Sequence, residues 1–323
     1  MPPTRPKLNF IYMEILHWPI DEELKKETLE HYRTNLAIKL KEEDPLSIIH
    51  QITFDSAAEA ITLGDIKKLF DFAERKFLKK KIAGIGLEVG AGPGTFSSVL
   101  ASFDSVGKMY AVEVCEPIVE LLGPKVAEYI LGERKNKVEG VVGSFDRIEL
   151  PDESVDFVFD FFSLHHSNNL AKTLKECNRI LKKGGFIFCF DKARPDYFTQ
   201  NDLSELLDRE CSEQEKRFFG LPADRKLTRR MCGEKEYQLK DWFSSFEKAG
   251  FSKIDHFYLA KTTGKRLIKN FISILPVFIQ IRLNKLLPEP KYSHNFILSS
   301  ENKVFSRFVN PFPKEISLLI AYR

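Results

Sequence analysis

Three glycines, separated from one another by single residues, form the part of the sequence whose spacing best suits a chemical role. Gly90, Gly92 and Gly94 follow a short apolar run, and a helical pattern begins at Thr95. Glycine lets the backbone turn sharply and lets a ligand approach where a Cβ atom would block it. The first turn of the following helix also presents unpaired N–H groups. The spacing therefore predicts a ligand-binding turn between a strand and a helix, the alternative being a glycine-rich turn that binds nothing.

The spacing of these glycines also distinguishes between two kinds of nucleotide-binding turn. Dinucleotide-binding domains use the pattern GxGxxG. Here the pattern is GxGxG, and Thr95 lies where a dinucleotide-binding domain has its third glycine. An acidic residue, Glu88, and a hydrophobic residue, Val89, come directly before it. In this form the stretch resembles the first motif of the class I S-adenosylmethionine-dependent methyltransferases.

Stretches that resemble the next motifs of this family follow in the expected order. Glu113 ends an apolar run about 20 residues after the glycines, where a carboxylate can accept hydrogen bonds from both ribose hydroxyls of a nucleoside. Gly143, Ser144 and Phe145 resemble the loop that flanks adenine. Many relatives have Asp directly after this glycine, whereas this chain has Ser144, with Asp146 as an acid that can substitute.

The resemblance continues through the second half of the core. Residues 157–166 resemble the fourth-strand motif of small-molecule methyltransferases, residues 174–185 the helix before strand five, and residues 246–251 the helix end before strand six. Together these motifs cover residues 80–260 and imply S-adenosyl-L-methionine as the cofactor. The residues that the resemblance places at the cofactor are Glu88, Gly90, Ala91, Gly92, Gly94, Glu113, Val114, Ser144, Phe145 and Phe161.

The hydrophobic pattern independently predicts an α/β fold with a doubly wound, mostly parallel sheet. Strands that alternate with helices indicate a parallel sheet covered on both faces. The resemblance adds that seven strands follow the order 3-2-1-4-5-7-6, with the last strand antiparallel. We expect strands at 84–89, 109–114, 138–142, 155–162, 186–190, 251–259 and 316–321, and helices at 117–131, 170–181 and 239–249.

Changes of pattern divide the chain into four parts. Two helical patterns, at 21–41 and 56–81, fall in its first part. The parts are a helical N-terminal extension or lid (1–80), the methyltransferase core (81–260) with a helical lid (191–240), a basic and apolar insertion (261–314), and the final strand of the core sheet (315–323).

Two adjacent histidines, His165 and His166, are the candidate catalytic residues. They lie just past the predicted fourth strand, and ligands of open α/β sheets gather beyond the carboxyl ends of the strands. Methyl transfer from a sulfonium is an in-line displacement that needs no metal and no covalent intermediate. A base is needed where the acceptor must lose a proton, and imidazole titrates near neutrality. The alternative is that these histidines pack or touch the cofactor. Other candidates past strands four and five are Asp191, Lys192, Arg194 and Tyr197.

The expected methyl acceptor is a small molecule or a glycan- or lipid-linked intermediate, with oxygen as the preferred accepting atom. The net charge is only +3, whereas nucleic-acid-binding proteins usually carry a strong basic excess. The sequence also has neither the Asn/Asp-Pro-Pro-Tyr stretch nor the Pro-Cys nucleophile of nucleic-acid methyltransferases. The alternatives are a non-catalytic cofactor-binding or regulatory protein that retains the fold, and an enzyme that uses the nucleoside cofactor differently.

Basic side chains gather in the predicted lid at 191–240. They could recognise a phosphate or carboxylate on the acceptor, the alternative being a solvated lid. They are Arg209, Lys216, Arg217, Arg225, Lys226, Arg229, Arg230 and Lys235.

Composition favours the cytoplasm. The five cysteines are scattered without a CxxC pair, which indicates neither a zinc site nor a disulfide framework. No secretion signal and no apolar run of about 18 residues is present. The basic and apolar stretch 261–291 suits either peripheral contact with the inner face of the membrane or packing on the core or a second subunit. The oligomeric state stays open.

Overall fold

The protein is described here from a computed structural model, in which a nine-stranded sheet forms the centre. The structure describes residues 13–26, 43–49, 67, 70, 71, 73–194, 196, 198–213, 216, 222–261, 296–299 and 316–323.

The order of the central strands is the order that the sequence predicts. The strands run β1-β4-β3-β2-β5-β6-β9-β7-β8 across the sheet, and β1 to β6 are mutually parallel. β9 runs antiparallel to both of its neighbours, β6 and β7. The strands are β1 (Glu14–His17), β2 (Gly84–Val89), β3 (Val106–Glu113), β4 (Val138–Val142), β5 (Val155–Phe161), β6 (Leu181–Lys192), β7 (Lys253–Lys261), β8 (Phe296–Ser299) and β9 (Ile316–Tyr322).

The prediction of seven strands is corrected to nine. β1 adds to one edge of the sheet beside β4, and β8 adds to the other edge beside β7. Both have only four residues and pair on one side alone, so neither needs the long apolar run that marks a central strand. The remaining seven strands have the expected order, with the antiparallel strand between strands five and six.

Alternating side chains give the sheet two apolar faces. In β5, Phe157 and Phe159 point to one face and Val158 to the other, as the two-residue period of a strand requires. Phe188 of β6 continues the first face, and its ring stacks beside that of Phe159 at 6.1 Å between centroids. The chain has 28 phenylalanines, and those of β5 and β6 serve core packing on this face.

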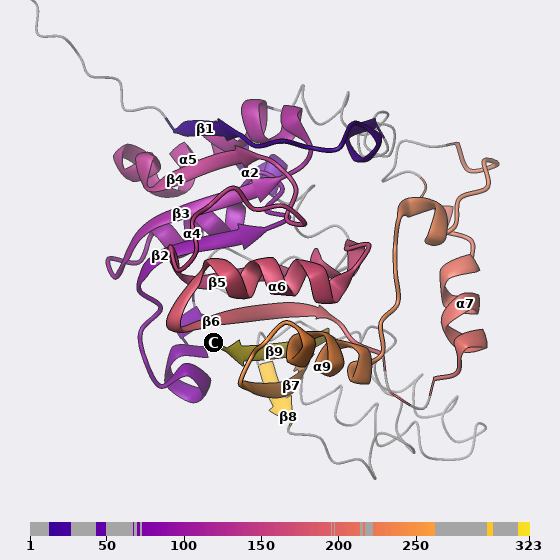
Figure 1. Cartoon of the computed structure of the whole chain (residues 1–323). Coiled ribbons are helices and arrows are strands. Elements are labelled where there is room, and N and C mark those ends of the chain that lie inside the picture. Colours follow the sequence, from indigo (N-terminus) through magenta and orange to yellow (C-terminus); the bar gives the residue numbers. More distant parts are fainter. Residues whose placement is uncertain are drawn as a thin grey trace, which may run out of the picture.

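Helices cover both faces, which makes a three-layer fold (Figure 1). α4 (Thr95–Ala101) and α5 (Gly123–Leu131) bury apolar side chains with the phenylalanine face, together with α2 (Pro45–Ile49). α6 (Leu170–Ile180) and α9 (Leu239–Lys248) pack on the opposite face. Shorter helical turns are η3 (Glu74–Leu78), η4 (Ile118–Leu122), η5 (Gly132–Lys137), η6 (Leu164–His166) and η7 (Arg230–Cys232).

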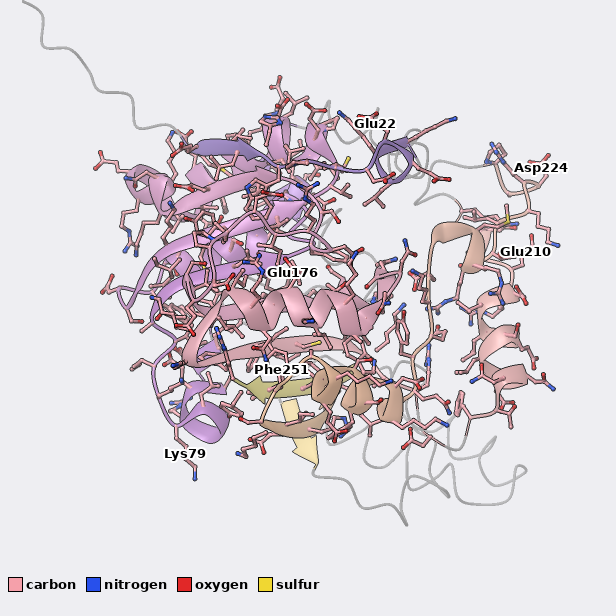
Figure 2. The ribbon with its side chains drawn as sticks, in the orientation of Figure 1. Glu22, Lys79, Glu176, Glu210, Asp224 and Phe251 are labelled. Carbon is pink, nitrogen blue, oxygen red and sulfur yellow. The ribbon has the colours of Figure 1, made fainter. Side chains whose placement is uncertain are left out.

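The carboxyl ends of the parallel strands point to the side on which α7 (Gln200–Asp208) lies (Figure 1). Thr199 caps α7 by accepting the N–H of Asp202 and donating to its carboxylate. Figure 2 shows Glu210 and Asp224 on this outlying part of the chain, away from Glu176 on α6. The segment returns to the sheet where Arg194 and Tyr237 share a backbone hydrogen bond of 2.8 Å. It therefore stands over the edge of the sheet where ligands are expected.

Several predictions for the outer parts fall wholly or mostly outside the described residues. This holds for the helices at 21–41 and 56–81, and for the insertion at 261–314 apart from Lys261 and β8. The described part of the N-terminal extension contributes a strand, β1, which the sequence did not predict. The described residues of 191–240 include α7, helical residues at Glu213 and Lys216, the short turn η7 and the start of α9, joined by turns and extended chain. Within the described residues, no helix has the length and apolar character needed to cross a membrane.

Candidate active site

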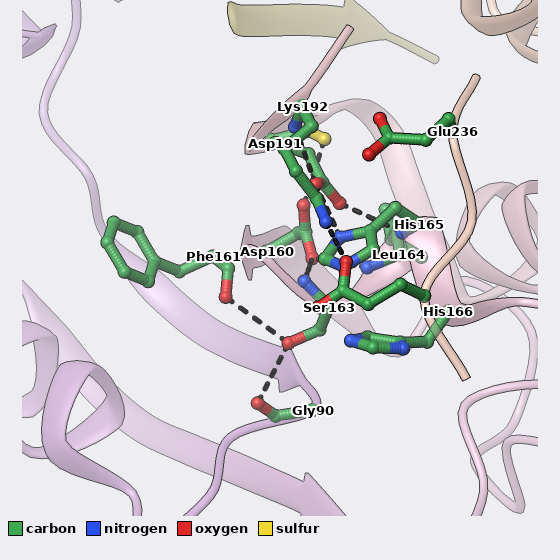
Figure 3. Close-up of polar contacts among 12 residues, drawn as sticks. Gly90, Asp160, Phe161, Ser163, Leu164, His165, His166, Asp191, Lys192 and Glu236 are labelled. Carbon is green, nitrogen blue, oxygen red and sulfur yellow. Dashed lines mark hydrogen bonds and ion pairs between the residues drawn. The ribbon is translucent and has the colours of Figure 1, made fainter. Parts of the chain in front are cut away.

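The glycine turn lies between β2 and α4 and approaches the loop after β5 closely. Gly90, Gly92 and Gly94 all have left-handed backbone angles, with φ values of 61°, 52° and 74°. A Cβ atom on Gly90 would lie 2.4 Å from the Cβ and Oγ of Ser163. The hydroxyl of Ser163 donates to the Gly90 carbonyl at 3.0 Å (Figure 3). Glycine is thus required at this position both by the backbone angle and by the close approach of a second loop.

Glu88 connects the strand before the glycine turn to the helix after it. Its buried carboxyl group accepts the backbone N–H of Ser97 at 2.7 Å and also the Ser97 hydroxyl. Ser97 lies in the first turn of α4, where backbone N–H groups have no partner within the helix. Burial raises the pKa of Glu88 to about 8. Glu88 therefore positions the helix behind the glycines, and its contact with the cofactor stays a prediction.

Glu113 connects the end of β3 directly to the glycine turn. One carboxylate oxygen accepts the N–H of Gly92 at 3.0 Å, and the other accepts the N–H of Cys115 at 3.0 Å. The side chain is almost buried, and burial raises its pKa. Each oxygen of a carboxylate can accept a further hydrogen bond. The structure thus brings together two residues that the sequence assigned to one ligand, with acceptor capacity left for hydroxyl groups.

The loop after β4 contains the residues expected near adenine. Ser144 is buried and Phe145 is half-buried. Asp146, the expected substitute acid, accepts the hydroxyls of Ser167 and Thr173 and thereby ties the loop to the start of α6. Both contacts use the Oδ1 atom of Asp146, so this residue has a structural role in fixing the loop, and a ligand contact by Ser144, Phe145 or Asp146 stays a prediction.

The sequence did not point to Trp18, which also lies beside this loop. Trp18 follows β1 and donates its backbone N–H to the Val142 carbonyl at 2.9 Å. Its ring fills the space next to Gly143, where a Cβ atom would lie 3.0 Å from the indole. The only available signal was a tryptophan after a four-residue strand, because nothing in the local sequence shows that this strand pairs with β4.

The remaining residues assigned to the cofactor line the same edge. Ala91 is buried, and its N–H donates to the Val112 carbonyl at 2.9 Å. Val114 is half-buried beside Glu113. The ring of Phe161 at the end of β5 packs on Phe96 of α4, with 4.3 Å between centroids. The next residue along, Phe162, has a φ of 57°, a strained conformation for a large side chain.

His165 is enclosed by carboxylates and is not accessible from the edge of the sheet. Its exposed fraction is 2%, its Nδ1 lies 2.6 Å from a carboxylate oxygen of Asp191, and its backbone N–H donates to the other Asp191 oxygen (Figure 3). Burial lowers the pKa of His165, but the charge of Asp191 outweighs this effect and the net shift is upward. A histidine enclosed in this way is poorly placed to take a proton from a substrate.

His166 is exposed and lies beside His165, with 4.1 Å between the ring centroids. Its Nδ1 is 3.1 Å from the carbonyl oxygen of Gly233. Because a carbonyl only accepts, Nδ1 carries the hydrogen and Nε2 keeps its lone pair. Surrounding protein atoms and the charge of His165 lower the pKa of His166, which favours this neutral form. Of the two predicted histidines, His166 has the geometry to act on a substrate.

A charged segment, residues 229–237, closes this end of the site. Glu234 forms ion pairs with Lys192 and with Arg229, the latter at 3.3 Å. Glu236 is fully buried and is shared by Arg194 at 2.6 Å and Arg229 at 3.0 Å. Burial raises the pKa of Glu236, but these arginines lower it more. The sequence analysis missed both glutamates, since each gains its role only through residues far away in the chain.

Several of the other predicted candidates have structural partners. Tyr197 and Arg217 lie outside the described residues. Lys216 pairs with Glu210, and Arg230 pairs with Asp208 on α7. Lys235 donates to the carbonyls of His166 and Ser167 and so fastens the 229–237 segment to the histidine loop. These contacts support the shape of the site, and recognition of an anionic acceptor by this group stays a prediction.

Comparison with known proteins agrees with this architecture. Residues 87–189 match the family model of a methyltransferase domain. A demethylmenaquinone methyltransferase of Roseiflexus castenholzii is 32% identical over 114 residues, which are 35% of this chain and 44% of that protein. A malonyl-[acyl-carrier protein] O-methyltransferase of Methylococcus capsulatus is 28% identical over 102 residues, 31% of this chain and 34% of that protein. The chain thus spans less than half the length of these two curated relatives.

Among solved structures, a SAM-dependent methyltransferase of Thermotoga maritima aligns with 85% of this chain and 97% of its own. The TM-score is 0.47 and the sequence identity is 17%.

The fold and the matched stretch together define a class of protein. The order of the seven central strands and the glycine turn after β2 are those expected of a class I, Rossmann-like methyltransferase. Residues 87–189 match the family model of a methyltransferase domain, and the match covers the stretch that contains the glycine turn and Glu113. S-adenosyl-L-methionine is accordingly the cofactor that this domain implies.

Proposed function

We propose that the protein is a methyltransferase that moves the methyl group of S-adenosylmethionine to a small-molecule acceptor. The observation that carries the proposal is the contact between the Glu113 carboxylate and the Gly92 N–H. It places a nearly buried carboxylate against a turn of three left-handed glycines at the carboxyl ends of parallel strands. This arrangement suits a ligand that has both hydroxyl groups and a part that must approach the backbone closely.

The residues that would hold the cofactor form two groups. Gly90, Gly92 and Gly94 with Glu113 offer backbone access and a hydroxyl-binding carboxylate. Ser144 and Phe145 would flank the adenine, and Phe161 would contribute an apolar wall. The residues fit the cofactor, because the Glu113 carboxylate adjoins the turn with acceptor capacity for hydroxyl groups and every glycine of the turn has positive φ.

When bound, S-adenosylmethionine supplies an activated methyl group, so that a lone pair of the acceptor forms a bond to carbon while the carbon–sulfur electron pair remains on sulfur. The acceptor atom must give up its proton in this reaction if it carries one. His166 is the side chain through which the protein acts on the acceptor, because its Nε2 lone pair faces away from its Gly233 partner. That lone pair can take a proton or bind a metal ion. His165 holds the loop in place through Asp191.

The acceptor is proposed at the level of a class. One relative is named for a menaquinone precursor and the other for O-methylation of a malonyl group on a carrier protein. Both names describe non-nucleic-acid acceptors, in line with the weak net charge of this chain. We infer an acceptor with a hydroxyl or carboxyl oxygen, carried on a small molecule or on a glycan- or lipid-linked intermediate.

The test combines cofactor binding with turnover. Calorimetric titration with S-adenosylhomocysteine should show one site per chain. Formation of S-adenosylhomocysteine is then measured with a panel of phenols, carboxylates and sugar derivatives. The substitution His166→Ala should lower turnover at least about a hundredfold, in the range that removal of an acid–base group usually produces, and leave cofactor affinity unchanged.

The matched control is His256→Ala, since His256 lies on β7 and bonds to Ser317 at 3.1 Å. It should leave both quantities unchanged. If well-folded wild type binds no cofactor, the protein has kept only the fold, and the alternative of a non-catalytic protein replaces this proposal. If turnover is the same in the His166→Ala variant and wild type, His166 has no part in the reaction.

A further inference from the structure

Three side chains at the acceptor end converge in the manner of metal ligands. We propose that His165, His166 and Glu234 bind one divalent metal ion of the zinc type. One nitrogen or oxygen atom from each of the three lies within 4.8 Å of those of the other two. Two imidazoles and one carboxylate are a ligand set that such ions accept, with coordination positions left open for a substrate.

The Nε2 atom of His165 is the observation that points to a ligand. The side chain is 2% exposed, and Nε2 is a buried nitrogen without a hydrogen-bond partner in the described part of the protein. Glu234 lies next to it, with Nε2 and the nearer carboxylate oxygen 3.4 Å apart. A charge-assisted hydrogen bond would be shorter, at about 2.7–2.9 Å. Two ligands at about 2.1 Å from a tetrahedral metal ion are separated by about 3.4 Å.

The partners of the other ring nitrogens support the same conclusion. A metal-binding histidine usually donates its second ring N–H to a carboxylate or a backbone carbonyl, which orients the ring. Nδ1 of His165 has the Asp191 carboxylate at 2.6 Å, and Nδ1 of His166 has the Gly233 carbonyl at 3.1 Å. Both rings are therefore fixed by an acceptor of the expected kind, which leaves Nε2 of each histidine as the nitrogen available to a metal ion.

Lys192 and Arg229 oppose the binding of a cation, because both pair with Glu234. The Lys192 side chain is 12% exposed, and its ammonium group must release Glu234 when the metal binds. Lys192 and the metal compete for Glu234. Removal of the lysine charge should therefore tighten metal binding, a result not expected if these residues form only an ion-pair network.

The role of the metal in catalysis rests on the proposed methyltransferase function, whereas its binding does not. A hydroxyl or carboxyl oxygen of the acceptor would occupy an open coordination position. An acceptor hydroxyl would lose its proton to water more readily there, since the metal lowers the pKa of a bound hydroxyl. The oxygen lone pair would then form the bond to the methyl carbon. In this case His166 acts on the acceptor through the metal and does not itself take the proton.

The experiment uses the full chain without an affinity tag, stripped of metal and titrated with Zn²⁺ by calorimetry and with Co²⁺ by visible absorption. Wild type should bind one ion per chain, with the intense Co²⁺ spectrum of a low-coordinate nitrogen and oxygen site. The variants His166→Ala and Glu234→Gln should each bind at least about tenfold more weakly, and Asp191→Asn about 10–100-fold more weakly. Lys192→Met should bind more tightly than wild type.

The control variant is His17→Ala, because His17, Glu116 and Glu120 are a second group with suitable spacing on the surface. If His17→Ala abolishes binding, the ion sits there and the proposal is wrong. Absence of binding by wild type and by Lys192→Met also overturns it. Cofactor titration of the same samples separates the two proposals: S-adenosylhomocysteine binding without metal binding leaves the methyltransferase and removes the metal. Metal binding without cofactor binding keeps the metal site and removes the proposed methyltransferase function. In both titrations, each variant must have the circular dichroism spectrum of wild type.

Discussion

The carboxylate of Glu113 gives the sharpest prediction about the cofactor site. In the substitution Glu113→Ala, the backbone N–H groups of Gly92 and Cys115 lose their acceptor, each from a bond of 3.0 Å. The cofactor also loses the acceptor proposed for its ribose hydroxyls. A hydrogen bond to a charged group contributes about 1.5–3 kcal/mol. Because water replaces part of this loss, we expect about 3 kcal/mol less binding free energy, or affinity weaker by about a hundredfold.

The substitution Glu113→Gln separates charge from shape. The amide keeps one oxygen as an acceptor and places an NH₂ group against one of the two N–H donors. We expect an intermediate loss of about tenfold, or 1.4 kcal/mol, with little effect on packing. The assay is calorimetric titration with S-adenosylhomocysteine, accompanied by thermal unfolding to confirm that each variant is folded.

The matched control is Glu116→Ala, because Glu116 lies three residues further along and is 37% exposed beside Lys25. It should bind like wild type. If Glu113→Ala also binds within about twofold of wild type, the carboxylate does not hold the ribose and the assignment of the turn as the cofactor site fails. If both variants lose affinity equally, general loss of negative charge explains the result and Glu113 has no special role.

Two further predictions concern the turn and its support. Gly90→Ala should destabilise the protein by more than Gly132→Ala, since both glycines have positive φ but only the Cβ at Gly90 would meet another side chain. Backbone strain alone costs about 1–2 kcal/mol, so urea unfolding should show the excess at Gly90, and equal losses would contradict the close approach of Ser163. Glu88→Gln should become more stabilising as the pH rises from 5 to 7. Because the folded-state pKa of Glu88 is about 8, above its unfolded value of 4.5, wild type loses about 1.4 kcal/mol per pH unit in this range. A pH-independent difference between variant and wild type would disprove the raised pKa.

The local sequence predicted most of the sheet because its central strands carry their own signals. The apolar runs at 84–89 and 138–142 coincide with β2 and β4. The run at 316–321 begins at the first residue of β9. A strand buried on both faces needs a nearly continuous apolar run, so its position can be predicted from the local sequence. β1 is the contrasting case. Its four residues have an exposed, half-buried pattern, and pairing with β4 alone defines them as a strand.

The same distinction applies to the site. The glycine turn could be singled out from the sequence because it is a local βα unit whose spacing is fixed by backbone geometry. Glu113 could be singled out because it ends the next strand. The contact between Glu113 and Gly92 then follows from β3 lying beside β2. The roles of His165 and His166 were not predictable in the same way. Adjacent in sequence, they differ because one ring points into Asp191 and the other toward Gly233.

The family match covers only one part of the proposed site. The stretch shared with the methyltransferase family ends at residue 189, so it includes the glycine turn, Glu113 and both histidines. Glu234, Glu236 and Arg229 lie beyond it: Glu234 adjoins His165, and Arg229 pairs with both glutamates. A relative that matches only the shared stretch therefore shows no likeness to residues 229–237, which contact His166 through Gly233 and Lys235 and which we propose to adjoin the acceptor. The names of such relatives can thus guide the choice of donor, whereas the acceptor must be sought by changing residues 229–237.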